Sequence, residues 1–117
     1  MEASILYLKE KKMAKHNFRE LKIWHLGIGF CKEILHQTKS FPKSETYGLI
    51  SQINRACISI PSNIAEGSSR ESNKEFDHFP DISPGSCFEV ETQIEIAISL
   101  NYIEPIIAEN LKINFRN

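Results

Sequence analysis

Two copies of a Glu-x-x-His spacing stand out in the sequence, Glu33-Ile-Leu-His36 and Glu75-Phe-Asp-His78. Helical bundles that bind two iron ions use this spacing on two helices, with one further glutamate from each of the other helices. Such ligands must project into the bundle. The apolar spacing around both copies instead places Glu33, His36 and His78 on outer faces. We therefore expect no metal site.

Other residue patterns that support catalysis are absent from the sequence. It contains no GxSxG nucleophile motif, no HExxH metal motif and no phosphate-binding loop. Gly27 and Gly29 lie inside a segment of helical spacing, which favours close helix packing over phosphate binding. Glu89, Glu91 and Glu95 are typical of a solvated helix face rather than of acid/base catalysis. We predict a protein that is not an enzyme and binds neither a cofactor nor a small-molecule substrate.

The length and composition fit one compact domain. A chain of 117 residues can bury a core without disulfides. Cys31, Cys57 and Cys87 have no CxxC spacing, which predicts reduced, mostly buried thiols in a cytoplasmic protein. No apolar run reaches the roughly 20 residues of a membrane helix, so we expect no membrane association. We interpret residues 1–13 as an extension outside the core, not as a signal peptide, and residues 14–117 as a single domain.

Apolar residues at helical spacing predict the first two elements of this domain. The first helix is expected over about residues 18–40, and the second over about residues 44–67, with Ser44 as its cap and Gly67 as its stop. The predicted core seam of the first helix consists of Leu21, Trp24, Ile28, Cys31, Leu35 and Thr38, widened by Ile23, Leu26, Phe30 and Ile34. The predicted seam of the second consists of Ile50, Ile53, Cys57, Ile60 and Ile64.

Pro61 falls inside the second predicted helix. The apolar spacing continues beyond it, because Ile64 follows in register, and we predict a kinked but continuous helix. A proline at this position deprives the carbonyl of Cys57 of its helical N–H donor. Nearby polar groups or water must then satisfy that carbonyl.

The third helix is expected to begin at the capping box of residues 72–75 and to end at Asn101. Pro80 and Pro84 lie within its apolar register, so we predict one long helix that is kinked or interrupted near them. Ser86 could instead cap a fresh helix. The predicted seam consists of Phe76, Phe79, Ser83, Ser86, Val90, Gln93, Ala97 and Leu100.

A fourth helix of about ten residues is expected from Pro105, which suits the first helical position. The predicted fold class is therefore all-α, an up-down-up-down four-helix bundle with a short fourth helix. A helix this short leaves a groove that the N-terminal extension or another subunit must fill.

Basic residues near the first helix suggest a nucleic-acid contact. Lys15, Arg19 and Lys22 would form this basic outer face, with His25 nearby, whereas Trp24 lies on the predicted seam. Basic residues alone bind phosphate without sequence choice. The net charge of −1 and the lack of a recognised motif do not describe a strongly basic nucleic-acid binder.

Several segments together strongly resemble the 23S rRNA-intervening-sequence protein family, also called the four-helix-bundle protein family. They are FRELKIW (18–24), FPKSETYGLISQINRACISIPSNIAEGSSR (41–70), SNKEF (72–76) and EVETQIEIAISLNYI (89–103). The resemblance implies an up-down-up-down bundle that forms a homo-oligomer, since similar proteins assemble as pentamers. It also implies kinship with accessory proteins of diversity-generating retroelements, which associate with nucleic acid and reverse transcriptase. It supplies no catalytic residues. The chain departs from the family pattern at FPDISPGS (79–86) and in its short fourth helix.

The leading hypothesis is a non-enzymatic, oligomeric scaffold in the cytoplasm, associated with RNA or with a nucleic-acid-bound protein. The alternative is a module that binds RNA or DNA directly through Lys15, Arg19 and Lys22. A polar residue on a seam usually fixes register or partner geometry. The polar residues expected to serve packing or assembly are Arg55, Ser62, Asn63, Glu66, Glu91 and Gln93.

Overall fold

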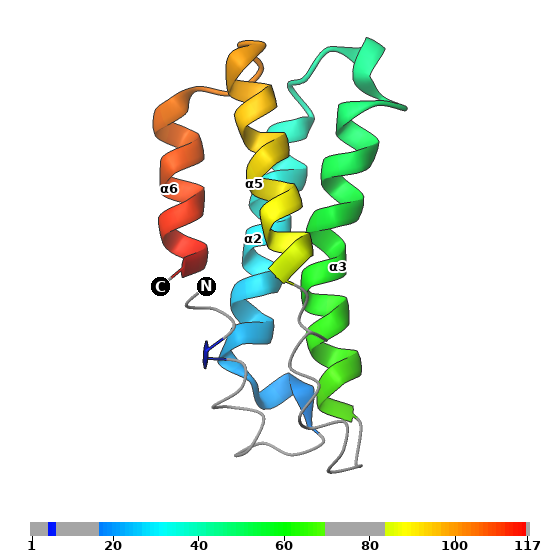
Figure 1. Ribbon diagram of the computed structural model, residues 1–117, viewed down its shortest axis with the longest axis vertical. Helices are drawn as coiled ribbons and strands as arrows, with labels where there is room; N and C mark the ends of the chain where they lie inside the picture. Colours follow the sequence, from blue (N-terminus) through cyan, green and yellow to red (C-terminus); the bar gives the residue numbers. More distant parts are fainter. Residues whose placement is uncertain (1–4, 7–16, 70–83, 117) are drawn as a thin grey trace.

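The computed structural model describes residues 5–6, 17–69 and 84–116 (Figure 1). Its elements are η1 (Phe18–Glu20), α2 (Lys22–Thr38), η2 (Lys43–Glu45), α3 (Leu49–Ser69), α5 (Pro84–Ser99) and α6 (Pro105–Arg116). Each helix packs against its neighbours along the chain, and α6 returns to α2 to close a ring of antiparallel helices. The described residues contain no strand. The predicted all-α, up-down four-helix fold is thereby confirmed. No helix in these ranges combines the length and apolar character required to cross a membrane.

The core face of α2 is rotated relative to the predicted seam. Its buried residues are Ile23, Gly27, Phe30, Cys31, Ile34 and Thr38. Ile28 is 36% exposed, so its predicted place in the core is wrong, whereas Trp24 is half-buried and packs against the core cluster. The cause is that α2 packs against both α3 and α6. These two contacts bury Ile23, Phe30 and Ile34, which were predicted to lie beside the seam.

Helices α2 and α3 begin at other residues than predicted. Leu21 adopts an extended conformation between η1 and α2, so the first helix begins after it. The second begins at Leu49 and not at Ser44, because residues 43–45 form a short 3-10 helix. The carboxylate of Glu45 caps the new start by accepting the Leu49 N–H at 3.1 Å.

The prediction that α3 continues through Pro61 is confirmed. The predicted stop at Gly67 is wrong, since α3 extends to Ser69 and Gly67 is buried within it. No described glycine adopts the left-handed conformation that such a stop uses. The packing residues of α3 were otherwise predicted correctly: Ile53, Cys57, Ile60 and Ile64 are each at most 1% exposed.

The predicted boundary between α5 and α6 is confirmed. Asn101 adopts a left-handed φ of 61°, and the N–H of Tyr102 reaches back to the carbonyl of Ala97 at 2.8 Å. This arrangement ends a helix and satisfies its last carbonyls. Pro105 occupies the first position of α6, whose 12 residues make it the shortest of the four α-helices.

The predicted seam of the third helix is partly correct. Val90, Gln93 and Ala97 are buried on α5, whereas Leu100 is exposed because it follows the last turn of the helix. The predicted capping box, Phe76, Phe79 and Pro80 lie outside the described residues, so the kink predicted there stays a prediction.

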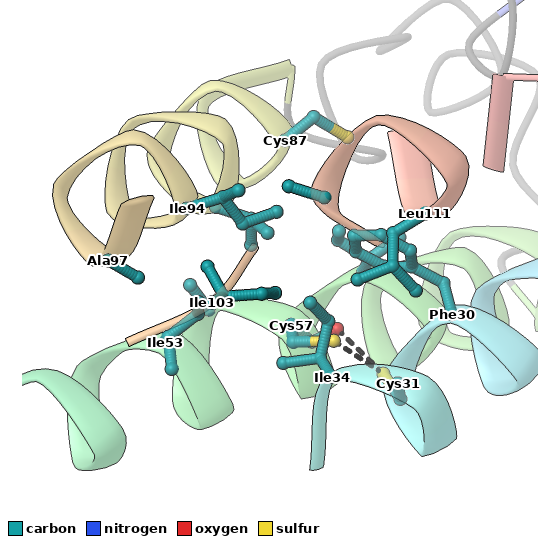
Figure 2. Packing of buried hydrophobic residues seen from close by; sticks show 14 of the residues in the cluster. Phe30, Cys31, Ile34, Ile53, Cys57, Cys87, Ile94, Ala97, Ile103 and Leu111 are labelled. Carbon is teal, nitrogen blue, oxygen red and sulfur yellow. Dashed lines mark hydrogen bonds between the residues drawn. The ribbon is translucent and has the colours of Figure 1, made fainter. Parts of the chain in front are cut away.

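The core lies along the axis of the bundle and receives side chains from all four helices. Figure 2 shows Phe30 and Ile34 of α2, Ile53 of α3, Ile94 of α5 and Leu111 of α6 converging there. Leu6, from the N-terminal segment, packs against the same cluster. That segment therefore contributes at least one apolar side chain to the bundle.

Candidate interaction surfaces and polar sites

The solvent-facing side of α5 carries large apolar residues. Phe88 is 57% exposed, Ile96 43% and Leu100 47%, and their spacing places them along one side of the helix. Between them, Thr92 donates its hydroxyl to the Phe88 carbonyl at 2.8 Å, and Ser99 donates to the Ile96 carbonyl at 2.8 Å. We call these five residues the α5 outer face. These two hydroxyl donors are used inside the helix, and the exposed carboxylates of Glu89 and Glu95 lie beside this face.

A second surface lies over the junction of α2 and α3. It is a shallow groove lined by Phe18, Trp24, Ile28, Cys31, Ile58, Pro61, Ser62 and Ala65, and we call it the α2–α3 groove. Phe18 and Trp24 meet edge to face, with ring centroids 5.2 Å apart. The lining is almost wholly apolar, and its polar groups are the thiol of Cys31 and the hydroxyl of Ser62.

The two helices lie close together at Gly27. A Cβ atom built on Gly27 would lie 3.3 Å from the Cβ of Pro61. That separation is tighter than an ordinary van der Waals contact. Gly29, two residues further along α2, has nothing within 4 Å of the equivalent position. The glycine at position 27 therefore sets how closely α2 packs on the proline of α3.

The carbonyl freed by Pro61 has a partner in α2. The thiol of Cys31 donates to the carbonyl oxygen of Cys57 at 3.0 Å (Figure 2). This carbonyl would otherwise bond the N–H four residues later, which proline lacks. The sequence predicted that a donor was required but did not identify it, because the donor comes from another helix.

The two thiols also contact each other. The Cys57 S–H donates to the Cys31 sulfur at 3.2 Å. That bond and burial raise the pKa of Cys57, because both favour its protonated form. The same bond lowers the pKa of Cys31 by stabilising its thiolate, against the opposing effect of burial. Burial, with a contribution from the Glu91 carboxylate, raises the pKa of Cys87 to about 11.

The polar residues predicted to serve packing or assembly do not form one cluster. Ser62 lines the α2–α3 groove, and its hydroxyl donates to the Ile58 carbonyl at 2.9 Å. Arg55 and Glu66 are exposed on α3, and Asn63 is half-buried there. Glu91 is half-buried on α5.

Gln93 differs from these residues because it is only 6% exposed. Its Oε1 atom has no hydrogen-bond partner within the part of the chain that the structure describes. A buried polar atom left unpaired costs roughly 1–3 kcal/mol of stability. Gln93 is therefore a polar residue at a core position whose retention is not explained by a bond within the described bundle.

The predicted nucleic-acid contacts are only partly described. Arg19 and Lys22 are exposed near the start of α2, and the Arg19 guanidinium lies 4.5 Å from the centroid of the Phe18 ring. Lys15 lies outside the described residues. Arg19 therefore adjoins the aromatic end of the α2–α3 groove, through its contact with Phe18.

The residues of the first Glu-x-x-His copy, Glu33 and His36, are exposed on α2, as their helical spacing predicted. Glu75 and His78 fall outside the described residues. Within the described ranges, no three His, Cys, Asp or Glu side chains gather in a way that could hold a metal ion.

A polar contact missed by the sequence analysis joins the two connections at one end of the bundle. The Tyr102 hydroxyl donates to Glu45 Oε2 at 2.9 Å, while Glu45 Oε1 caps the start of α3. The Phe41 ring packs against the Tyr102 ring, with the two ring centroids 5.3 Å apart. A Cβ on Gly48 would lie 2.8 Å from Glu45 Oε1, so the glycine leaves room for the carboxylate. A glutamate four residues before an apolar helical run was the only sequence signal for this contact.

This contact predicts a dependence of stability on alkaline pH. The bond to Glu45 raises the pKa of Tyr102, because its phenolate would face a carboxylate. A raised pKa contributes stability that is complete below the unfolded value of about 10 and is lost as the pH rises through the folded value. We therefore expect the melting temperature of the wild type to exceed that of Tyr102→Phe by a constant margin up to about pH 9, and by less above pH 10. Thermal melts from pH 7 to alkaline pH measure this margin, and one that stays constant throughout would contradict the expectation.

Comparison with protein-family models matches residues 19–116 to the family described as 23S rRNA-intervening sequence protein. The match spans most of the chain, including all four described α-helices from their first residues. It confirms the resemblance indicated by the four sequence segments. The comparison with curated proteins found no match.

Proposed function

This chain belongs to the 23S rRNA-intervening sequence protein family, and from that premise we propose that it is a non-catalytic scaffold that assembles with copies of itself. The family consists of small helical proteins with no known catalytic role. The proposed contact surface is the α5 outer face, and the proposed assembly is the pentamer that the family resemblance implies.

The observation that carries this proposal is that α5 exposes large apolar side chains on the side that faces away from the core. One side packs into the core through Val90, Ile94 and Ala97. The opposite side exposes Phe88 and Ile96. Exposed large apolar side chains that gather on one side of a helix usually mark an interaction surface, and such a surface is commonly rimmed by polar residues, as Glu89 and Glu95 are exposed here. A second subunit would cover this one.

Light scattering after size-exclusion chromatography tests the self-association at micromolar protein concentration. We expect a discrete oligomer for the wild type and a monomer for the double variant Phe88→Asp/Ile96→Asp, since burying two carboxylates in an apolar interface is costly. Ile106→Asp is the matched control, because Ile106 is 64% exposed on α6, outside the proposed surface. It should assemble like the wild type. A monomeric wild type, or a double variant that still assembles, would refute the proposal.

We further propose that the assembly associates with RNA or with a ribonucleoprotein. The support is the contact of the exposed Arg19 with Phe18, whose ring meets that of Trp24, together with the exposed Lys22 at the start of α2. Basic and aromatic side chains together contact single-stranded nucleic acid. Fluorescence anisotropy of a labelled RNA with the assembled protein measures this association. Binding through phosphates should weaken steeply as salt rises and decrease in Arg19→Gln/Lys22→Gln. If no RNA binding is detected at low salt, direct RNA binding is refuted, and the partner of the scaffold would be a protein.

A further inference from the structure

Two cysteines from different helices hold their sulfur atoms 3.2 Å apart inside the bundle. A disulfide bond is about 2.05 Å long, so the two sulfurs need to approach by about 1.2 Å to form one. Cys31 and Cys57 are both free thiols, and the third cysteine, Cys87, lies apart from them in Figure 2. The fold thus pairs two particular thiols.

The pair is reached from one side. Cys31 lines the α2–α3 groove and is 6% exposed, whereas Cys57 is fully buried beneath it. A small molecule in the groove therefore reaches Cys31 before Cys57. The bond that Cys57 donates stabilises the thiolate form of Cys31, which is the nucleophilic form.

From this geometry we propose that Cys31 and Cys57 are a redox-modification site, at which a peroxide converts the two thiols into an intramolecular disulfide between α2 and α3. This inference is independent of the scaffold function and of the α5 outer face. It requires only the fold of one subunit and an oxidant small enough to enter the groove.

The reaction proceeds in two balanced steps. The Cys31 thiolate attacks one oxygen of hydrogen peroxide, the O–O bond breaks, and the departing hydroxide takes a proton to become water, which leaves a sulfenic acid on Cys31. The Cys57 sulfur then attacks the Cys31 sulfur, the S–O bond breaks, and the oxygen leaves as a second water with the Cys57 proton. The two thiols lose two electrons in total, and the peroxide gains them.

The disulfide changes the junction as well as joining the helices. Cys31 no longer has an S–H to donate, so the Cys57 carbonyl loses the donor that compensates for Pro61. Oxidation therefore exchanges a hydrogen bond at this point for a covalent link. Reduction by a dithiol should restore the original arrangement.

The test uses the full chain treated with a small excess of hydrogen peroxide. Remaining thiols are then alkylated under denaturing conditions, and the protein is analysed by intact mass and by peptide mapping. We expect the mass before alkylation to fall by about 2 Da, which corresponds to the two hydrogens lost. We also expect one alkylated cysteine where the three free thiols of the reduced protein gave three. The map should join the peptides of Cys31 and Cys57, and a dithiol should reverse the change.

Two variants make the assignment specific. Cys87→Ser should form the same link at the same rate, while Cys31→Ser, which keeps a hydroxyl donor for the Cys57 carbonyl, should form none. Three outcomes would overturn the proposal: an unchanged mass, a bond that includes Cys87 or a second chain, or a sulfinic acid accumulating on Cys31 with Cys57 still free. The peptide map of the wild type decides the matter even if a variant fails to fold.

Discussion

Replacing Gly27 by leucine is expected to destabilise the fold by about 3 kcal/mol, whereas leucine at Gly29 should stabilise it slightly. Both glycines lie in α2, so the loss of backbone flexibility in the unfolded chain is the same for each. A Cβ at position 27 already meets Pro61 at 3.3 Å, and the remaining atoms of leucine have no room without moving α2. A Cβ at position 29 meets nothing within 4 Å, so that variant gains helix propensity of roughly 0.8 kcal/mol.

Urea denaturation of the two variants and the wild type measures this difference in the free energy of unfolding. The comparison controls for helix propensity because the residue introduced and the helix are the same. The stability of Gly27→Ala should lie between those of the two leucine variants, since alanine gains helix propensity but brings its Cβ against Pro61. Equal stabilities for leucine at the two positions would show that α2 does not rest on Pro61 as described.

Removing the thiol of Cys31 is expected to cost about 1–3 kcal/mol, but much less when Pro61 is also replaced. In Cys31→Ala the Cys57 carbonyl stays buried without a donor. In Pro61→Ala the backbone gains an N–H at position 61, which can donate to the Cys57 carbonyl as in an ordinary helix. The thiol is then redundant as a donor.

A double-mutant cycle isolates this coupling from the packing that each substitution removes. We expect the cost of Cys31→Ala to fall by about 1 kcal/mol or more in the Pro61→Ala background. Cys31→Ser is the control, since a hydroxyl keeps a donor in place and should cost less than alanine. An identical cost of Cys31→Ala in both backgrounds would mean that the thiol does not compensate for the proline.

The sequence predicted best what depends on local chemistry or on one packed face. The spacing of Ile53, Cys57, Ile60 and Ile64 identified the buried face of α3 even across Pro61. Asn101 and Pro105 were predicted correctly because each has a backbone preference that ends or begins a helix.

Prediction from the sequence was wrong or incomplete for features that depend on which helices are neighbours. The prediction placed Ile28 on the seam of α2 and Ile23 and Phe30 only on its flank, but contact with α6 as well as α3 buries that flank and leaves Ile28 exposed. The donor to the Cys57 carbonyl depends on how α2 and α3 are aligned along their axes. The contact of Gly27 with Pro61 sets this alignment. The spacing of apolar residues along one helix contains no information on its alignment with another helix.

The α5 outer face was missed for a related reason. Its register assigned Leu100 to the core, yet α5 ends at Ser99 and leaves that side chain exposed. The internal bonds of Thr92 and Ser99, which make the face less polar, follow from the helix itself but carry no signature in residue type. The glutamates on this side of the helix predicted a solvated face; Glu89 and Glu95 are indeed exposed, but Phe88 and Ile96 are exposed beside them.

The bond between Cys31 and the Cys57 carbonyl also constrains the order in which mutations can accumulate. A lineage that loses the thiol while it keeps Pro61 passes through a protein with an orphaned carbonyl. A lineage that loses Pro61 first avoids that intermediate, because the backbone then supplies the donor. Replacement of Cys31 by a residue without a side-chain donor should therefore follow replacement of Pro61, whereas serine at position 31 is compatible with the proline.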